Sequence, residues 1–162
     1  MGHTFGRNSL KQYNTLHRDL QIVVDWGIKY CRVDFSLIEG HRPVEKQFEY
    51  FKKGREFDGE NWKIVNKKQV ITYVDGYDKK GKHNYLPSLA VDICAHVPGK
   101  PELSWDLTHL TYISSNLIMI SEFLHEQGII THKLTWGANW DRDGDLADHK
   151  FYDRPHLEIY TS

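Results

Sequence analysis

Two distant segments of this 162-residue chain hold histidine and aspartate residues in a pattern that suits a metal ion. The segments are residues 82–92 and 153–158, and together they offer His83, Asp92 and His156 as ligands. Catalytic zinc is typically held by three ligands drawn from histidine and carboxylate, which leave a fourth position for a water that the metal acidifies. The sequence therefore predicts a single zinc site of the kind that hydrolases use.

Other residues of ligand type compete with this set. His96 and His149 are the nearest spare imidazoles, although we expect them to be ordinary surface or core residues. Weaker candidates are His41, His125 and His132. The acidic run Asp141–Asp145 partly resembles a calcium loop, but its glycine is fourth rather than sixth, and Tyr152 stands twelfth where the loop requires glutamate. We expect a solvated turn there, with Ca²⁺ binding as the weaker alternative.

The composition is that of an ordinary folded domain. A length of 162 residues fits one domain and can bury a core without disulfides. The chain is 40% hydrophobic and 27% charged with a net charge of −1, which argues against nucleic acid as a partner. Cys31 and Cys94 each lie in an apolar stretch, so we expect buried, reduced thiols rather than a disulfide.

Apolar spacing predicts the elements that position the candidate ligands. In the N-terminal half we expect an amphipathic helix from residue 9 to near residue 27, a half-buried strand over residues 31–38 and a helix over residues 43–54. Residues 54–88 are rich in glycine, lysine, aspartate and asparagine, with only short apolar runs such as residues 70–74. This composition predicts a long irregular excursion with one or two edge strands.

The C-terminal half has clearer periodicity. Alternation predicts a strand over residues 89–95 that projects Asp92 from one face, and helical spacing predicts the longest helix over residues 104–127. Two further strands are expected at residues 133–136 and 156–160, joined by an acidic loop. We therefore predict one α+β domain over residues 1–162, with a small antiparallel sheet flanked by helices.

Four separated blocks of this sequence resemble the zinc peptidoglycan peptidases. The blocks are Glu39-Gly40-His41-Arg42-Pro43 with Gln47, Lys82-His83-Asn84 to Pro87-Ser88 and Ala90-Val91-Asp92, Trp136-Gly137-Ala138-Asn139-Trp140, and Asp153 to His156 with Glu158. This family contains VanY-like D-alanyl-D-alanine carboxypeptidases, vancomycin-resistance dipeptidases and phage L-alanyl-D-glutamate endopeptidases, and its fold is shared with the hedgehog signalling domain. The match is nearest to the phage endolysin branch and spans roughly residues 9 to 160.

The chain departs from the commoner family pattern at a few positions. Asp92 follows His83 by nine positions here, where seven is usual, and Pro87-Ser88 occupies the intervening turn. His41 and Leu157 stand where the family usually has aromatic residues.

The resemblance implies zinc held by His83, Asp92 and His156, with Asp153 as the catalytic base. A carboxylate three residues before a ligand could take a proton during attack and pass it to the leaving amine. By the same resemblance, Arg42 would stabilise charge on the carbonyl oxygen or bind a substrate carboxylate. Glu158 shares a strand face with His156 and is better placed to orient that ligand, but it stays open as an alternative base.

The function implied by the resemblance is that of a zinc metallopeptidase that cleaves the stem peptide of peptidoglycan between L-alanine and D-glutamate, as a phage endolysin. A D-alanyl-D-alanine carboxypeptidase and a non-catalytic zinc-containing binding module remain alternatives. Asp153 and Arg42 favour an enzyme, because a binding module needs no base beside the metal. A metal nuclease, suggested by His83-Asn84, is disfavoured because no basic groove accompanies it.

Expectations about place and partners complete the hypothesis. Residues 1–7 lack the apolar core of a signal peptide, and the longest apolar run, residues 117–120, is too short to span a bilayer. We expect a monomer made in the host cytoplasm, without membrane insertion, that reaches the cell wall after another protein opens the membrane. We expect no separate wall-binding domain, and Trp136 and Trp140 belong either to the core or to a substrate groove.

Overall fold

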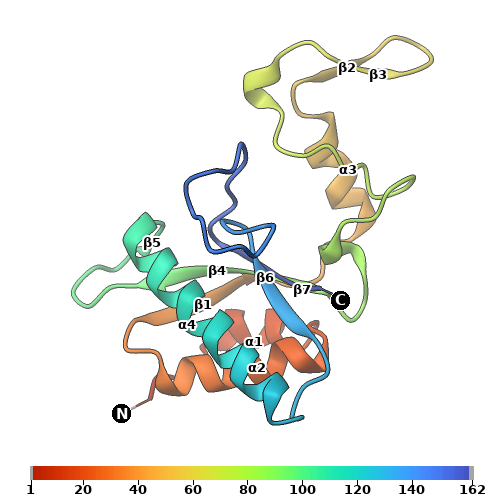
Figure 1. The fold of residues 1–162 in the computed structure, drawn as a ribbon. Coiled ribbons are helices and arrows are strands. Elements are labelled where there is room, and N and C mark those ends of the chain that lie inside the picture. The colour runs from red at the N-terminus through yellow and green to blue at the C-terminus, as the bar shows by residue number, and fades with distance from the viewer. Residues whose placement is uncertain (1, 161–162) are drawn as a thin grey trace.

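An antiparallel sheet forms the centre of the computed structural model, which describes residues 2–160. Within those residues the main strands lie in the order β1, β4, β7, β6, and a short strand, β5, pairs with the end of β4. The strands are β1 (Asp34–Glu39), β4 (Ala90–His96), β5 (Leu103–Ser104), β6 (Lys133–Trp136) and β7 (His156–Tyr160). With the helices beside this sheet, the predicted α+β architecture is confirmed (Figure 1).

Three helices pack beside the sheet: α1 (Arg7–Tyr13), α2 (Arg18–Tyr30) and α4 (Leu107–Glu126). The core forms where α2 and α4 meet one sheet face, and it includes Val24, Phe35, Ile93, Leu117 and Leu157. Gly27 allows α2 to approach α4 closely, because a Cβ at that position would lie 2.3 Å from a methyl group of Leu117.

The opposite face of the sheet carries the polar residues. Residues directly opposite each other in paired strands share a face. Asp92 of β4 pairs with His156 of β7, and Ala90 pairs with Glu158. Asp92, His156 and Glu158 therefore project together from the face that the helical core does not cover.

The single helix predicted over residues 9–27 is wrong, because α1 and α2 are separate. Residues 14–17 break the helix where they pair with Ser88: the Ser88 N–H donates to Thr15 at 2.7 Å, and the His17 N–H donates to Ser88 at 2.9 Å. His17 then caps α2, since its Nδ1 accepts the Asp19 N–H at 3.1 Å. Tertiary pairing has replaced hydrogen bonds that a continuous helix would make.

Other boundaries differ more modestly from the prediction. The first strand begins at Asp34 rather than residue 31, and β5 was not predicted. The longest helix begins at Leu107 rather than residue 104, because Asp106 caps it by accepting the N–H groups of Thr108 and His109. Cys31 and Cys94 are buried free thiols, as predicted.

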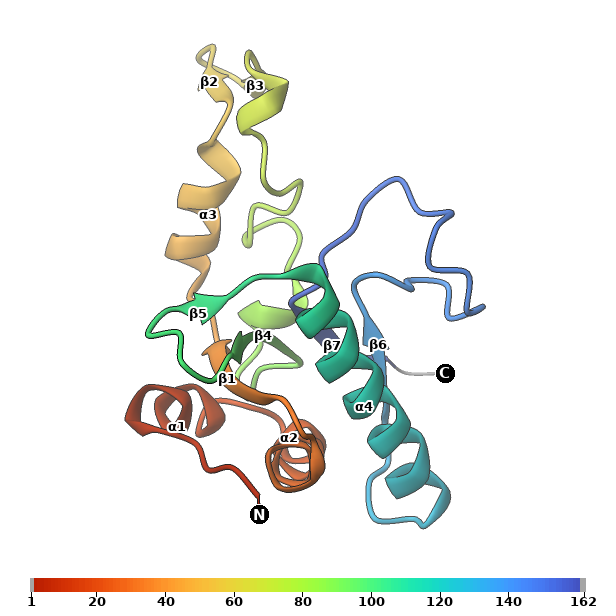
Figure 2. The same cartoon turned by 90° about the vertical axis from the view of Figure 1, so that its left-hand side faces the viewer.

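Residues 44–82 form a projection that we call the arm. It contains α3 (Val44–Lys52), β2 (Arg55–Phe57), β3 (Trp62–Ile64) and the 3₁₀ turn η1 (Lys67–Gln69), and it leads into the 3₁₀ turn η2 (Lys82–Asn84). Figures 1 and 2 both show the arm extending away from the sheet and its helices. The predicted excursion with edge strands is confirmed, although the strands lie at β2 and β3 and not at residues 70–74. Phe48 holds the arm together by packing against Phe51, Trp62 and Tyr77.

Candidate metal centre

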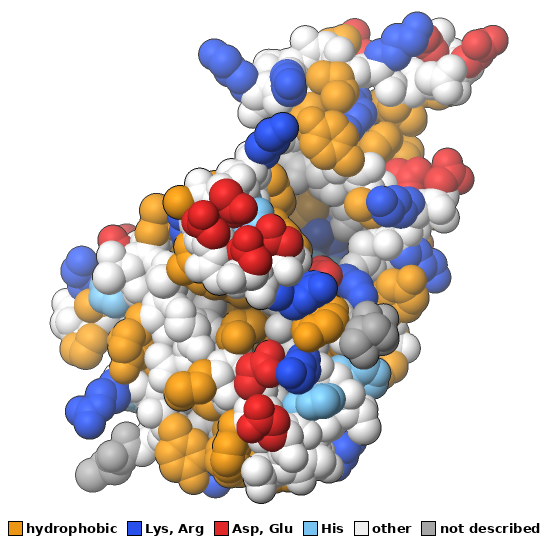
Figure 3. Space-filling view, viewed as in Figure 1, with side chains coloured by type: hydrophobic (Ala, Val, Ile, Leu, Met, Phe, Trp, Pro, Cys, Tyr) orange, Lys and Arg blue, Asp and Glu red, His pale blue; other side chains and the backbone are white. Residues whose placement is uncertain are grey.

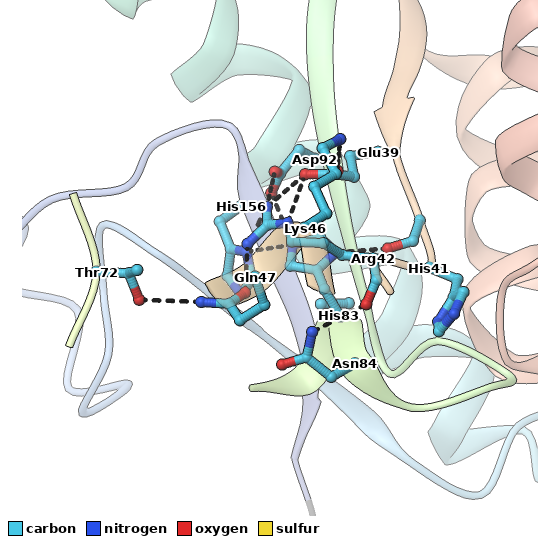
Figure 4. Close-up of polar contacts among 12 residues, drawn as sticks. Glu39, His41, Arg42, Lys46, Gln47, Thr72, His83, Asn84, Asp92 and His156 are labelled. Atoms are coloured by element: carbon cyan, nitrogen blue, oxygen red, sulfur yellow. Dashed lines mark hydrogen bonds and ion pairs between the residues drawn. The ribbon is translucent and has the colours of Figure 1, made fainter. Parts of the chain in front are cut away.

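The three predicted ligands come together at one point of the polar sheet face (Figure 4). His83 comes from η2, Asp92 from the middle of β4 and His156 from the start of β7. The His83 Nε2 lies 3.2 Å from Asp92 Oδ1 and 3.2 Å from His156 Nδ1, and the last two atoms are 3.0 Å apart. We call these three residues the triad.

Each histidine of the triad has its second ring nitrogen bound outside the triad. The Nδ1 of His83 lies 2.7 Å from the carbonyl oxygen of Gly40, and the Nε2 of His156 lies 3.0 Å from Glu158 Oε2. Hydrogen bonds of this kind fix the orientation and tautomer of metal-binding imidazoles. They leave Nε2 of His83 and Nδ1 of His156 facing Asp92.

The charges of the triad are strongly coupled. Burial alone would raise the pKa of Asp92, but hydrogen bonds with His156 and His83 outweigh it and hold that pKa well below its usual range. Burial alone would lower the pKa of His156, yet hydrogen bonds with Asp92 and Glu158 raise it to about 9. Without a metal the cluster therefore retains a proton on His156, which a bound cation would displace.

Asp153 lies beside the triad and lines the same cleft. Its backbone is fixed by a network: its N–H donates to Gly137 at 2.7 Å, the Gly137 N–H donates to His156 at 2.9 Å, and the His156 N–H donates back to Asp153 at 3.0 Å. Gly137 permits this close approach, because a Cβ there would lie 2.1 Å from the Asp153 carbonyl oxygen.

The carboxylate of Asp153 has the properties of a proton acceptor. Burial raises its pKa, and the Asp92 charge adds to that rise, while the histidines and Arg42 act in the opposite direction. Within residues 2–160 the Asp153 side chain makes no hydrogen bond, so its oxygens are free for a ligand. A carboxylate with a raised pKa in a cleft suits general base chemistry.

Arg42 lies at the edge of the triad. Its Nε and Nη2 donate to Glu39, its Nη1 donates to Gln47 Oε1 at 2.9 Å, and Nη2 lies 3.8 Å from Asp92 Oδ2. The Arg42 N–H also donates to the carbonyl of His83 at 2.8 Å, which ties the two segments together. The guanidinium is therefore held in place before any ligand arrives.

The triad lies in a cleft of about 740 Å³. One wall is formed by residues 70–74 of the arm, and the other by Trp140 and Phe151 of the acidic loop. The rings of Trp140 and Phe151 are stacked, with their centroids 6.3 Å apart. Figure 3 shows the surface hollowed between the arm and this loop. The ring of Trp140 lies 5.7 Å from that of His156, so Trp140 is a cleft residue.

The remaining candidates lie outside the triad. Trp136 is a core residue that is 5% exposed, and its indole N–H donates to Arg154 at 2.8 Å. His96 bonds to Ser36 at 2.7 Å, and His149 accepts the Trp140 N–H at 3.2 Å. The other histidines are equally separate from the triad: His41 lies against Tyr85, His132 against Asp19, and His125 in the last turn of α4.

The acidic loop has the hydrogen bonds of a solvated turn. The side chains of Asp143 and Asp145 each accept a backbone N–H two residues further on. Asp141 lies instead near Asp148 and His149, which together form a second, more exposed group of ligand type.

Two contributions to the site were not predicted from the sequence. The carbonyl of Gly40, which orients His83, is a backbone group and carries no side-chain signal. Phe151, which stacks on Trp140, lies in a loop without periodicity. A cleft-lining role for Phe151 could have been suspected only from its position two residues before Asp153.

Comparisons with known proteins identify the family of the chain. A family model described as phage L-alanyl-D-glutamate peptidase matches residues 1–160. The chain is 26% identical to the L-alanyl-D-glutamate peptidase of Escherichia phage T5 over 163 residues, which covers 98% of this chain and 99% of that protein. The fold is similar to that of the L-Ala D-Glu endopeptidase ChiX of Serratia marcescens, with a TM-score of 0.62 and 21% identity, covering 98% of this chain and 91% of that one.

Proposed function

The chain belongs to the phage L-alanyl-D-glutamate peptidase family, and on this premise we propose that it is a zinc metallopeptidase that hydrolyses the L-alanyl-D-glutamate bond of peptidoglycan stem peptides. The observation that carries the proposal is the convergence of His83, Asp92 and His156 at the floor of an open cleft. A base and an arginine beside them, Asp153 and Arg42, favour an enzyme over a binding module.

Zinc fits the triad on two grounds. Two imidazole nitrogens and one carboxylate oxygen are donors of the kind that catalytic zinc takes. A tetrahedral ion with bonds of about 2.0–2.1 Å needs its donors about 3.3–3.4 Å apart. The three donor atoms of the triad are 3.0–3.2 Å apart, so they need to move only slightly. Glu158 and the Gly40 carbonyl already orient the two rings as ligands require.

The residues of the cleft have separate roles in the proposed reaction. Zinc held by the triad would supply Lewis acidity at the scissile carbonyl. Asp153 takes a proton from the attacking water and returns it to the amine of the leaving D-glutamate. Arg42, already fixed by Glu39 and Gln47, presents positive charge to the carbonyl oxygen or to a substrate carboxylate. Trp140 and Phe151 offer an apolar wall against which the peptide lies.

The biological role that follows is lysis of a bacterial host at the end of phage growth. None of the helices within residues 2–160 has the length and apolarity needed to cross a membrane. We propose that the chain acts as a monomer on the cell wall, after a separate protein has opened the membrane.

The deciding experiment is digestion of purified peptidoglycan with and without a chelator, followed by addition of zinc. Mass spectrometry should find new L-alanine carboxyl and D-glutamate amino ends, lost with the chelator and restored by zinc. Release of terminal D-alanine would instead identify a D-alanyl-D-alanine carboxypeptidase. Absence of any cleavage under all conditions would favour the binding module.

A further inference from the structure

The part of the arm that leads back to the cleft has an unusual surface. Residues 65–74, which we call the return segment, run from the end of β3 to the cleft wall. Val65 is 59% exposed, Ile71 is 51% exposed and Tyr73 is 69% exposed, so apolar side chains face solvent along its length. Exposed apolar groups gathered on one segment are typical of an interaction surface.

The charge of the return segment has a single sign. Its charged residues are Lys67 and Lys68, both exposed, and it contains no acidic residue. Among the described residues, neither lysine lies within ion-pair distance of a carboxylate. The whole arm carries ten basic and seven acidic residues, a net charge of +3, whereas the rest of the chain carries −4. The return segment is therefore suited to an anionic partner.

The return segment is also continuous with the proposed catalytic cleft. Residues 70–74 form one wall of that cleft, and residues 65–69 continue from this wall toward the far end of the arm (Figure 1). Gln47 fixes this wall, since its Nε2 donates to the Val74 carbonyl at 2.7 Å. The same Nε2 lies 3.3 Å from Thr72 Oγ1, while the Gln47 Oε1 accepts from Arg42 (Figure 4). A polymer that extends from the cleft along this wall would reach residues 65–69.

We propose that the return segment binds the peptidoglycan that flanks the scissile bond. This inference rests on the proposed function, because it assumes that wall polymer occupies the cleft. Carboxylates of neighbouring stem peptides would pair with Lys67 and Lys68, while the apolar faces of the sugars would lie on Val65, Ile71 and Tyr73. The segment thereby gives the enzyme affinity for the insoluble polymer that the cleft alone does not supply.

The test compares two matched variants of the full chain. The arm variant combines Val65→Ser, Lys67→Gln and Lys68→Gln, none of which lines the cleft. The control variant combines Leu10→Ser, Lys11→Gln and Lys29→Gln, which remove one exposed apolar residue and two exposed lysines elsewhere. Each protein is sedimented with purified sacculi in the presence of a chelator to prevent digestion, at low and at high salt. The zinc-loaded proteins are assayed separately on a soluble stem peptide.

The arm variant should bind sacculi about fivefold more weakly than the unmodified chain at low salt, the sum expected of two exposed ion pairs and one apolar contact. High salt should reduce the difference. Cleavage of the soluble peptide should be unchanged in both variants, and the control variant should bind normally.

Three results would overturn the inference: equal sacculus binding by both variants, an equal loss in the control variant, or a loss seen with anionic lipid vesicles but not with sacculi. If the unmodified chain binds sacculi through the arm yet cleaves no soluble peptide, the proposed function fails while the binding surface stands. If the unmodified chain cleaves the soluble peptide and the arm variant binds sacculi normally, the proposed function stands while the binding surface fails.

Discussion

The floor of the cleft and its walls are built in different ways. At the floor, Asp92 and His156 face each other in paired strands, and each histidine of the triad is tied by a second hydrogen bond. The walls are residues 70–74 of the arm and the Trp140–Phe151 stretch of the acidic loop, which are irregular and largely exposed. Regular pairing and burial fix the groups that we propose perform chemistry, whereas the surfaces that we propose recognise the polymer lie on loops.

One side chain connects the two regions. Gln47 is 3% exposed and binds Arg42 at the floor while it binds Val74 and Thr72 in the arm wall. The difference between the regions suggests that substitutions at the floor will remove the reaction itself. Substitutions in the walls should alter how well substrate is held.

The largest effect is expected when a ligand is removed from the floor. His83→Ala should abolish zinc binding at the triad and lower kcat by more than about 10³-fold, because the Lewis acid is lost. Metal content by mass spectrometry of the intact protein and hydrolysis of a soluble stem peptide are the measurements. His96→Ala, which removes a histidine outside the triad, serves as control and should retain both metal and activity.

Removal of the base should separate chemistry from metal binding. Asp153→Ala should retain zinc and fold, yet lower kcat by about 10²–10⁴-fold, because no other carboxylate without a structural partner lines the described part of the cleft. Metal content and kcat are compared with those of Asp148→Ala in the same loop. Full activity in Asp153→Ala would overturn the mechanism and return attention to Glu158.

An intermediate effect is expected at the residue that orients a ligand. Glu158→Gln should weaken zinc affinity by about 10–100-fold, because the hydrogen bond that aligns His156 loses its charge. Excess zinc should restore most of the activity, which it cannot do for a missing base. Competition with a chromophoric chelator measures the affinity, and Glu126→Gln on the surface of α4 is the control. An activity loss that zinc does not rescue would argue that Glu158 is itself the base.

A wall substitution should affect binding more than turnover. Trp140→Ala should raise KM for a soluble stem peptide by about five- to tenfold and leave kcat nearly unchanged, since it removes apolar contact area beside the triad. Steady-state kinetics separates the two parameters. Trp105→Ala, an exposed tryptophan outside the cleft, should change neither. A fall in kcat with unchanged KM would indicate that Trp140 contributes to the reaction itself and not to substrate binding.

The smallest effect on activity is expected below the floor, at Asp19. The Asp19 carboxylate accepts hydrogen bonds from the backbone N–H groups of Thr131 and His132. The Nδ1 atom of His132 lies 2.8 Å from the same carboxylate. Burial alone would raise the pKa of Asp19, but these hydrogen bonds outweigh it and lower that pKa.

Because the folded pKa is lowered, the stabilisation is present above the unfolded value of about 3.9 and is lost as pH falls through the folded value. Asp19→Asn should lower the free energy of unfolding by about 1–3 kcal/mol at neutral pH, and by less below about pH 4. Urea unfolding across pH checks this, with Asp143→Asn as control. A difference that is independent of pH would contradict the electrostatic explanation.

The sequence predicted the regular elements best where periodicity and tertiary structure agree. The strands at residues 133–136 and 156–160 were placed correctly, and the longest helix was found to within three residues. The N-terminal helix failed because its apolar spacing continues from Leu10 through Leu20 without glycine or proline. Its break depends on pairing with Ser88, more than 70 residues away, which no local pattern reveals.

The candidate site followed a similar division. The ligand types could be predicted from the sequence. The structure brings His83, Asp92 and His156 together, although Asp92 follows His83 by nine positions and not by the usual seven. The pairing of Glu158 with His156 also followed from strand alternation. The lining of the cleft could not be predicted, because residues 70–74 and Phe151 lie in irregular segments whose positions depend on long-range packing.

The position of β7 has a consequence for how the chain folds. This strand follows both of its neighbours in sequence, yet it lies between β4 and β6 in space. Those two earlier strands cannot complete their hydrogen bonding until the later one inserts, so the sheet depends on contacts of high sequence separation and should close late and slowly. Because β7 begins with His156, a growing chain that has not yet made this strand lacks a complete triad. Folding order thus makes a complete set of metal ligands one of the last features that this chain acquires.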